Sequence, residues 1–266
     1  MKNVKLPVTL HRVLKSSAGS LIILFLAVPT EAFRHKTSNE EIKKTSSDKS
    51  IVDSCNVQSI CIDSMCKLNK SYAVKLNARV VPFVKKYIIE EGARLEKMKV
   101  WGKPYFDMYD AILTHYGLPK ELKYLSVIES DLTAKAVSRA GAVGPWQIMA
   151  EGATDMGLKI NSRVDERKSF RKSTHAAAKI LKGLYSEFKD WPLVIAAYNC
   201  GSGRVQQAIK KSGSKNFWAL QSYLPLETRC HVKRFMSTHF IFEGSGGLTT
   251  MTAAEVKRYE MKMAAM

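Results

Sequence analysis

Residues 192–198 read PLVIAAY, and this stretch decides the fold class. Pro192 stands where the first turn of a helix tolerates proline, and the residues after it are apolar on every side of a helix. A helix without a polar face is predicted to lie buried at the centre of a domain. The run ends in Tyr198 and Asn199, whose polar groups need partners at the end of that helix.

The segments on both sides of this run repeat their apolar residues every three or four positions, as amphipathic helices do. The spacing predicts further helices at about 76–95, 105–113, 122–128, 175–188, 203–209 and 231–242. Residues 252–255 read TAAE, a capping box that would begin one last helix. The sequence therefore predicts a mainly α-helical domain over residues 76–244, followed by a C-terminal tail over residues 245–266.

The beginning of the chain has the composition of an export signal. Basic residues precede an apolar run at residues 18–28, and small residues offer a cleavage site after Ala32. The run is shorter than the roughly 20 residues that a helix needs to span a bilayer. These features predict a signal peptide over residues 1–32, with an uncleaved N-terminal anchor as the alternative. A polar, flexible segment is predicted over residues 33–75, and the protein is expected in the periplasm or cell envelope.

The chain is strongly basic, with 42 Lys and Arg against 24 Asp and Glu and a net charge of +18. Such a balance favours a polyanionic neighbour, which could be nucleic acid, a membrane surface or a cell wall with acidic peptide stems. No helix-turn-helix, zinc-finger or RNA-recognition signature is found, so nucleic acid is not the expected partner. Peripheral contact with the wall or the membrane is the expectation that remains.

Five cysteines are present, and none of them forms a CxxC pair or has a histidine at zinc-finger spacing. No metal site is therefore predicted. An oxidising compartment would allow disulfides, for which Cys61 with Cys66 and Cys200 with Cys230 are the candidates. The odd number leaves at least one thiol unpaired within the chain.

Glu129 is the candidate catalytic acid, because it ends an apolar helix within the sequence VIESD at residues 127–131. Removal from water raises the pKa of a carboxyl group and keeps its acid form available near neutral pH. An ordinary surface glutamate at a helix end is the alternative reading of this segment alone. Two further segments favour catalysis: the glycine-containing turn SRAGAVGPWQIM at residues 138–149, and AYNCGSG at residues 197–203.

Taken together, three short motifs resemble those of the family 1 lytic transglycosylases, which carry an SLT domain. They are the ES pair at 129–130, GxWQ at 144–147 and AYNxG at 197–201, in that order. The resemblance covers roughly residues 76–243. It implies a lysozyme-like, goose-type helical fold with a groove for peptidoglycan glycan strands, and no metal or organic cofactor.

The resemblance also implies roles for individual residues. Glu129 would protonate the oxygen between N-acetylmuramic acid and N-acetylglucosamine, and would then act as base on the sugar's own 6-hydroxyl, closing a 1,6-anhydro ring without water. The other residues expected to contact the substrate or shape its groove are Ser138, Gln147, Trp146, Met149, Tyr198, Asn199 and His231.

Two positions depart from the family pattern, namely Pro145 and His231, where relatives have a larger apolar residue and a tyrosine. The role of His231 stays open between a packed polar residue and a contact of the catalytic carboxyl or the substrate. Two other functions also stay open. A second carboxylate, sought among Asp155, Asp165 and Glu166, would make the protein a lysozyme-like hydrolase. An inactive peptidoglycan-binding scaffold is the other alternative.

Overall fold

The computed structural model describes residues 74–265. The predicted signal peptide, almost all of the polar segment, and Cys55, Cys61 and Cys66 lie outside the described residues. The helices are α2 (Val81–Trp101), α3 (Lys103–His115), α4 (Tyr124–Ser130), α5 (Ala150–Asp155), α6 (Phe170–Phe188), α7 (Trp191–Cys200), α8 (Ser202–Ser212), α9 (Phe217–Leu220), α10 (Leu226–Glu243) and α11 (Ala253–Ala264). Short 3-10 turns are η2 (Lys120–Lys123), η3 (Glu166–Lys168), η4 (Gln221–Tyr223) and η5 (Leu248–Thr250).

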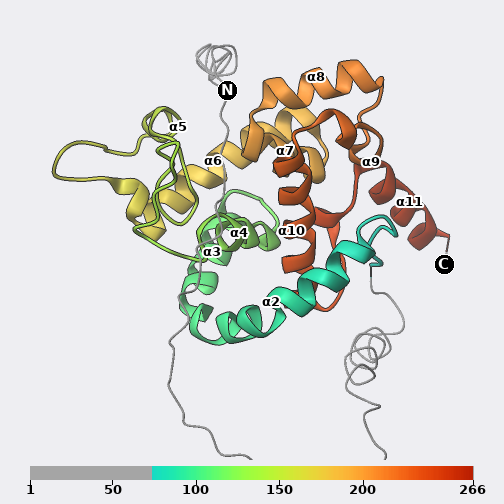
Figure 1. Ribbon diagram of the computed structural model, residues 1–266, viewed down its shortest axis with the longest axis horizontal. Helices are drawn as coiled ribbons and strands as arrows, with labels where there is room; N and C mark the ends of the chain where they lie inside the picture. Colours follow the sequence, from blue (N-terminus) through green and yellow to red (C-terminus); the bar gives the residue numbers. More distant parts are fainter. Residues whose placement is uncertain (1–73, 266) are drawn as a thin grey trace, which may run out of the picture.

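Helix α7 forms the centre of the core, as its apolar run predicts. Leu193, Val194, Ile195 and Ala196 are fully buried. The helix packs against α6, α8 and α10, and Figure 1 shows it enclosed by them. Burial of each Leu, Val or Ile side chain contributes about 1.5–3 kcal/mol through removal of apolar surface from water. The predicted mainly α-helical fold is therefore confirmed, and in residues 74–265 β pairing is limited to isolated bridges.

A buried carboxylate connects α7 to the last helix of the chain. Asp190 caps α7 by accepting a hydrogen bond from the backbone nitrogen of Leu193 at 3.1 Å. Its second oxygen accepts a hydrogen bond from the backbone N–H of Ala253, the first residue of α11, at 2.7 Å. The predicted capping box is also present at this end, where Thr252 and Glu255 bond reciprocally. The two caps together fix where α11 begins against the domain.

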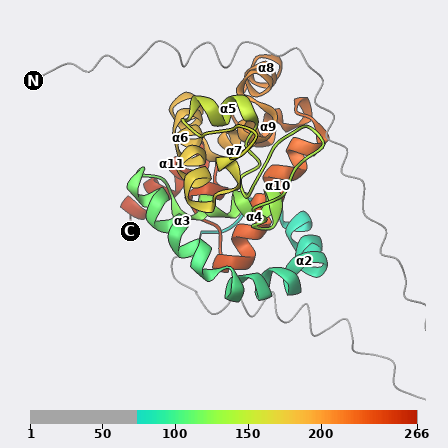
Figure 2. The ribbon, with the colours of Figure 1, turned by 90° about the vertical axis from the view of Figure 1, so that its left-hand side faces the viewer.

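Helices α10 and α2 frame the part of the molecule where Glu129 lies. Helix α10 runs through the middle of the molecule and packs along α2, α4 and α7, and α2 lies next to it in both Figure 1 and Figure 2. The predicted helix at 231–242 is thus longer than expected, because Pro225 precedes its first turn and the helix begins at Leu226. This extension adds residues 226–230, among them Glu227 and Thr228, to the helix that carries His231 and Arg234.

Some features differ from expectation. The short helices α5 and α9 were not expected, because elements of six and four residues are too short to show a helical period. Cys200 and Cys230, the candidate disulfide pair, are both free thiols. Among the helices of residues 74–265, none combines the length and the apolar character that a membrane crossing requires.

Candidate active site

Glu129 lies in the last turn of α4, directly after a buried stretch of that helix. The helix ends at Ser130, and Asp131, which caps it, adopts the left-handed conformation with φ 52°. The Glu129 side chain is only 15% exposed and opens onto a cavity of about 570 Å³. This cavity is lined from α2, α4, α10 and the loop between α4 and α5, by Tyr87, Glu91, Arg94, Val127, Ile128, Glu129, Ser130, Asp131, Ala136, Val137, Ser138, Arg139, Gln147 and Arg234.

The environment of Glu129 favours its acid form. Burial raises the pKa of its carboxyl from 4.5 to about 8, while the positive charge of Arg234 lowers it and the negative charge of Glu227 raises it. Desolvation is the largest of these effects. At neutral pH the carboxyl therefore carries a proton that it can donate into the cavity. This is the state that the sequence predicted for a catalytic acid.

His231 lies directly behind this carboxyl. Its Nε2 atom is 3.3 Å from Oε1 of Glu129, and its side chain is 4% exposed. Burial, with the nearby charge of Arg234, lowers the pKa of the imidazole to about 3. The pair is therefore two neutral groups at neutral pH rather than an ion pair. In the described part of the chain Nε2 has no hydrogen-bond partner, so the Glu129 carboxyl is the polar group it faces.

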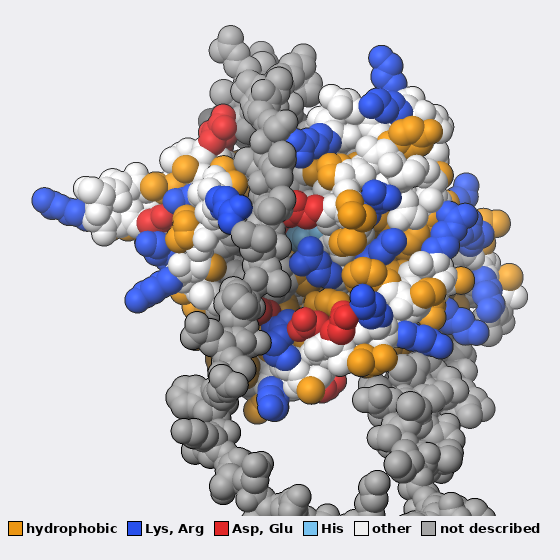
Figure 3. All heavy atoms as spheres, in the orientation of Figure 1, with side chains coloured by type: hydrophobic (Ala, Val, Ile, Leu, Met, Phe, Trp, Pro, Cys, Tyr) orange, Lys and Arg blue, Asp and Glu red, His pale blue; other side chains and the backbone are white. Residues whose placement is uncertain are grey.

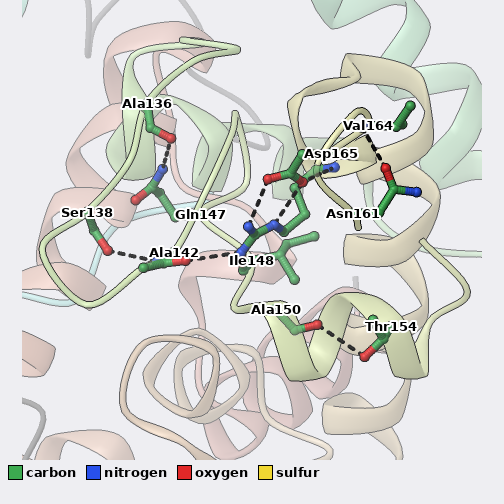
Figure 4. A network of polar contacts seen from close by, with 12 residues as sticks. Ala136, Ser138, Ala142, Gln147, Ile148, Ala150, Thr154, Asn161, Val164 and Asp165 are labelled. Carbon is green, nitrogen blue, oxygen red and sulfur yellow. Dashed lines mark hydrogen bonds and ion pairs between the residues drawn. The ribbon is translucent and has the colours of Figure 1, made fainter. Parts of the chain in front are cut away.

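Ser138 and Gln147 line the cavity from the loop that follows α4, as expected. Figure 4 shows both side chains held by this loop. The Oγ of Ser138 accepts a hydrogen bond from the backbone N–H of Ala142 at 3.0 Å, which leaves its own hydroxyl proton free to donate. Gln147 has φ 46°, and its Nε2 donates to the carbonyl oxygens of Ala136 at 3.3 Å and Gly144 at 3.0 Å. Both polar groups are thereby held at fixed positions on the cavity wall.

Tyr198 and Asn199 hold the surrounding elements together. The hydroxyl of Tyr198 donates to the carbonyl oxygen of Trp146 at 2.7 Å. Burial, and then the proximity of Glu129, raise the pKa of this tyrosine well above 10. The Oδ1 of Asn199 accepts the hydroxyl of Thr228 at 2.8 Å and so links α7 to α10. Neither residue lines the cavity, although Tyr198 is close enough to Glu129 for their charges to interact.

Trp146 and Met149, expected on the groove walls, lie elsewhere. Trp146 is fully buried, its indole nitrogen donates to the hydroxyl of Thr174 at 2.8 Å, and its ring centroid lies 5.2 Å from that of Tyr109. The indole belongs to the core beneath the loop because a buried hydroxyl satisfies its N–H there. Met149 precedes α5 and is 41% exposed, away from the cavity lining.

A buried arginine that the sequence did not reveal fastens this loop. Arg167 pairs with both carboxylate oxygens of Asp165 at 2.9 and 2.8 Å. It also donates to the carbonyl oxygens of Gly141 at 3.0 Å and Ile148 at 3.2 Å. Gly144 has φ 83°, and a Cβ built there would lie 2.0 Å from the carbonyl oxygen of Arg167, so only glycine fits. Arg167 thus fixes the loop on both sides of Gly144, at Gly141 and at Ile148.

The residues considered for a second catalytic carboxylate do not line the cavity. Hydrogen bonds from Arg167 lower the pKa of Asp165, and Glu166 bonds the backbone of Lys159 and the ammonium of Lys172. Two other acids, Glu91 and Asp131, do line the cavity with Glu129, and both pair with Arg94, at 2.6 and 2.5 Å. Within residues 74–265, no cluster of three or more His, Cys, Asp or Glu is placed to hold a metal ion.

Comparison with known proteins places this site in a family context. Residues 109–221 match the transglycosylase SLT domain family. Membrane-bound lytic murein transglycosylase D of Escherichia coli strain K12 is 33% identical over 174 residues, which make up 64% of this chain and 38% of that protein. The chain thus spans less than two fifths of the length of this curated relative.

Solved structures agree on the fold. The 70-kDa soluble lytic transglycosylase from Escherichia coli superposes with a TM-score of 0.50 at 21% identity, over 75% of this chain and 35% of that one. A complex of the 70-kDa soluble lytic transglycosylase with bulgecin A gives a TM-score of 0.52 at 17% identity, over 81% of this chain and 40% of that one. At such identities the likeness concerns the fold alone, and it confirms the lysozyme-like helical architecture.

Proposed function

We propose that this chain, which matches the transglycosylase SLT domain over residues 109–221, is a lytic transglycosylase that cleaves peptidoglycan glycan strands without consuming water. The bond cut is the β-1,4 bond between N-acetylmuramic acid and N-acetylglucosamine, and Glu129 acts first as acid and then as base. The observation that carries this proposal is the protonated, largely buried carboxyl of Glu129 at the edge of a large cavity.

In the first step the Glu129 proton moves to the bridging oxygen as the bond from C1 of muramic acid to that oxygen breaks. The leaving N-acetylglucosamine departs with a hydroxyl group, and the N-acetyl group of the muramic acid stabilises the cation at C1. In the second step the Glu129 carboxylate takes the proton of the 6-hydroxyl while that oxygen bonds to C1. Glu129 regains its proton, and the product carries a 1,6-anhydro ring.

A mechanism with one carboxylate fits the charges of the cavity. Hydrolases that retain or invert configuration place two carboxyl groups about 5–9.5 Å apart across the scissile bond. Here the other acids on the cavity wall, Glu91 and Asp131, are both paired with Arg94. Arg94 therefore holds one oxygen of each of these carboxylates. The lysozyme-like alternative gains no support from these contacts.

Neighbouring residues take supporting roles in this proposal. The Nε2–H tautomer of His231 donates to Oε1 when the carboxylate forms, which leaves Oε2 to exchange the proton with the substrate. Ser138 and Gln147 bind hydroxyl or amide groups of the reacting sugar from the cavity wall. Tyr198 and Asn199 hold the loop and α10 in place, and Trp146 supports the loop from the core.

The protein is proposed to act in the periplasm or cell envelope. Support comes from the basic and apolar pattern of residues 1–32 and from the name of the Escherichia coli relative, a membrane-bound murein transglycosylase. Figure 3 shows Lys and Arg side chains spread over most of the visible face, with a few Asp and Glu side chains near its centre. Such a surface suits contact with an anionic wall or membrane.

Mass spectrometry of the fragments released from purified peptidoglycan tests this function. Products one water lighter than hydrolytic fragments, ending in a 1,6-anhydro ring, are expected from the parent chain and not from the Glu129→Gln variant. Fragments with ordinary reducing ends would make the protein a hydrolase. Tight wall binding by a well-folded parent chain without any product would make it a scaffold.

A further inference from the structure

Three arginines line the cavity, and they differ in how their charge is balanced. The guanidinium of Arg94 is neutralised by Glu91 and Asp131, at 2.6 and 2.5 Å. Arg139 and Arg234 form no ion pair with any residue in the described part of the chain, although both line the same cavity. The cavity wall therefore carries two arginines that form no ion pair within residues 74–265.

Arg234 lies nearest to the chemistry. It follows His231 by one helical turn on α10 and is half-buried. Its charge acts on Glu129 and His231, and also on Tyr87 and Glu227, so it lies among groups from α2, α4 and its own helix. Glu129 is protonated at neutral pH, and Glu227 interacts with the charge of Arg234 without forming an ion pair with it. A half-buried cation is costly without an anionic partner.

The substrate of the proposed function can supply that anion, and this inference rests on that function. Each N-acetylmuramic acid carries a lactyl ether whose carboxyl is free in strands without peptides. In intact strands the lactyl group is joined to a stem peptide that has carboxylates of its own. A guanidinium binds a carboxylate through two parallel N–H···O bonds, which gives orientation as well as affinity.

We propose that Arg234, with Arg139 on the facing loop, forms an anion-binding subsite for a carboxylate carried by the muramic acid next to the scissile bond. Arg234 provides the fixed, half-buried contact beside Glu129. Arg139 is exposed on the loop between Ser138 and Ala142 and adds a second positive charge at the cavity mouth. The subsite distinguishes muramic acid from N-acetylglucosamine, which lacks the lactyl group, and so sets the register of the strand.

Binding measurements in the Glu129→Gln background test this subsite without cleavage of the probe. Three probes are compared by calorimetry: neutral chitohexaose, an alternating GlcNAc–MurNAc oligomer with free lactyl carboxylates, and the same oligomer with stem peptides. Arg234→Gln is expected to raise Kd about tenfold for the carboxylate-bearing oligomers and to leave Kd for chitohexaose unchanged. The effect should shrink as salt is added.

The two charged probes distinguish the sources of the carboxylate. A loss confined to the peptide-free oligomer assigns the subsite to the lactyl group, and a loss confined to the other assigns it to the stem peptide. Arg171→Gln, on the exposed face of α6 and away from the cavity, is the matched control and should leave all three Kd values unchanged. Melting curves verify that each variant is folded, and Arg234→Lys should restore part of the affinity.

Two results would overturn the inference. An equal loss of affinity for neutral and charged probes would make Arg234 a part of the cavity shape. Unchanged affinity for both charged oligomers would make it a solvated arginine. Either result would leave the proposed function in place if the parent chain still releases anhydro products. Absence of both cleavage and binding in the parent chain would instead remove the function and the subsite together.

Discussion

The Nε2 atom of His231 and the Oε1 atom of Glu129 lie 3.3 Å apart, although they are separated by most of the domain in sequence. Burial raises the pKa of the carboxyl to about 8 and lowers that of the imidazole to about 3. At pH values between these two, both groups are neutral, because the carboxyl keeps its proton and the imidazole has not gained a second one. In the proposed mechanism, Glu129 therefore donates and recaptures its proton beside a polar group that is itself uncharged.

Replacing Glu129 by Gln should abolish release of anhydro fragments from purified peptidoglycan. The amide keeps the shape of the side chain but has no transferable proton, and loss of a general acid and base reduces turnover by about 10²–10⁴-fold for each role. Fragment release measured by mass spectrometry checks this, with the melting curve of the variant as control. Retention of most activity in a folded variant would exclude Glu129 as the acid.

The same variant should gain stability over the parent chain as the pH rises. The folded-state pKa of Glu129 is raised from 4.5 to about 8, so its stabilising contribution is complete below pH 4.5 and is lost as the pH rises toward 8. Gln cannot ionise, so the difference in unfolding free energy should grow across that range to a few kcal/mol at most. Denaturant unfolding at pH 5 and pH 8.5 measures it. An equal difference at both pH values would contradict the raised pKa.

Turnover by the parent chain should fall above pH 8, because the acid form of Glu129 is then depleted. His231→Phe should lower turnover about tenfold and move this alkaline limit upward, since the carboxylate loses a polar neighbour at Oε1. The pH profile of fragment release is the measurement. His239→Phe is a matched control on the same helix, because His239 is also buried but faces the carbonyl oxygen of Ser245. An unchanged profile in His231→Phe would reduce His231 to a packing residue.

Arg167→Ala should lower both the stability of the fold and the affinity for the substrate. The change leaves the Asp165 carboxylate without its bidentate partner and frees the carbonyl oxygens of Gly141 and Ile148, at a cost of about 2–4 kcal/mol. The apparent KM for soluble glycan oligomers should rise more than kcat falls, because the loop carries Ser138 and Gln147. Arg163 is an exposed residue of the same segment, and Arg163→Ala should change neither the free energy of unfolding nor the KM. An unaltered KM would show that the loop keeps its shape without this clamp.

The sequence predicted those parts of the fold that depend on the pattern of apolar residues along a single helix. The apolar run of α7 and the end of α4 at Glu129 are of this kind, because a helical period reports directly which side chains face the core. The same period does not say which buried side chain faces a cavity. The family resemblance implied that Trp146 forms a groove wall, yet its indole is turned into the core, where the hydroxyl of Thr174 accepts a hydrogen bond from its N–H.

Contacts between distant segments were beyond what the sequence could predict. Asp165 and Arg167 stand two residues apart, and nothing in that spacing reveals that the arginine reaches Gly141 and Ile148. The position of His231 against Glu129 likewise depends on how α10 crosses α4. Departure from the family tyrosine drew attention to His231, whereas Arg234 had no comparable signal.

Helix α11 illustrates how a surface element can be part of the folding core. None of its residues is buried, so by exposure alone it resembles a removable extension. Yet its first amide bonds the Asp190 carboxylate that also caps α7. An affinity tag or fluorescent fusion placed after residue 264 would leave this bond intact. A truncated chain that ends before residue 253 would lose the backbone N–H that donates to Asp190, the residue that caps α7. Such a chain is expected to give a lower yield of folded protein.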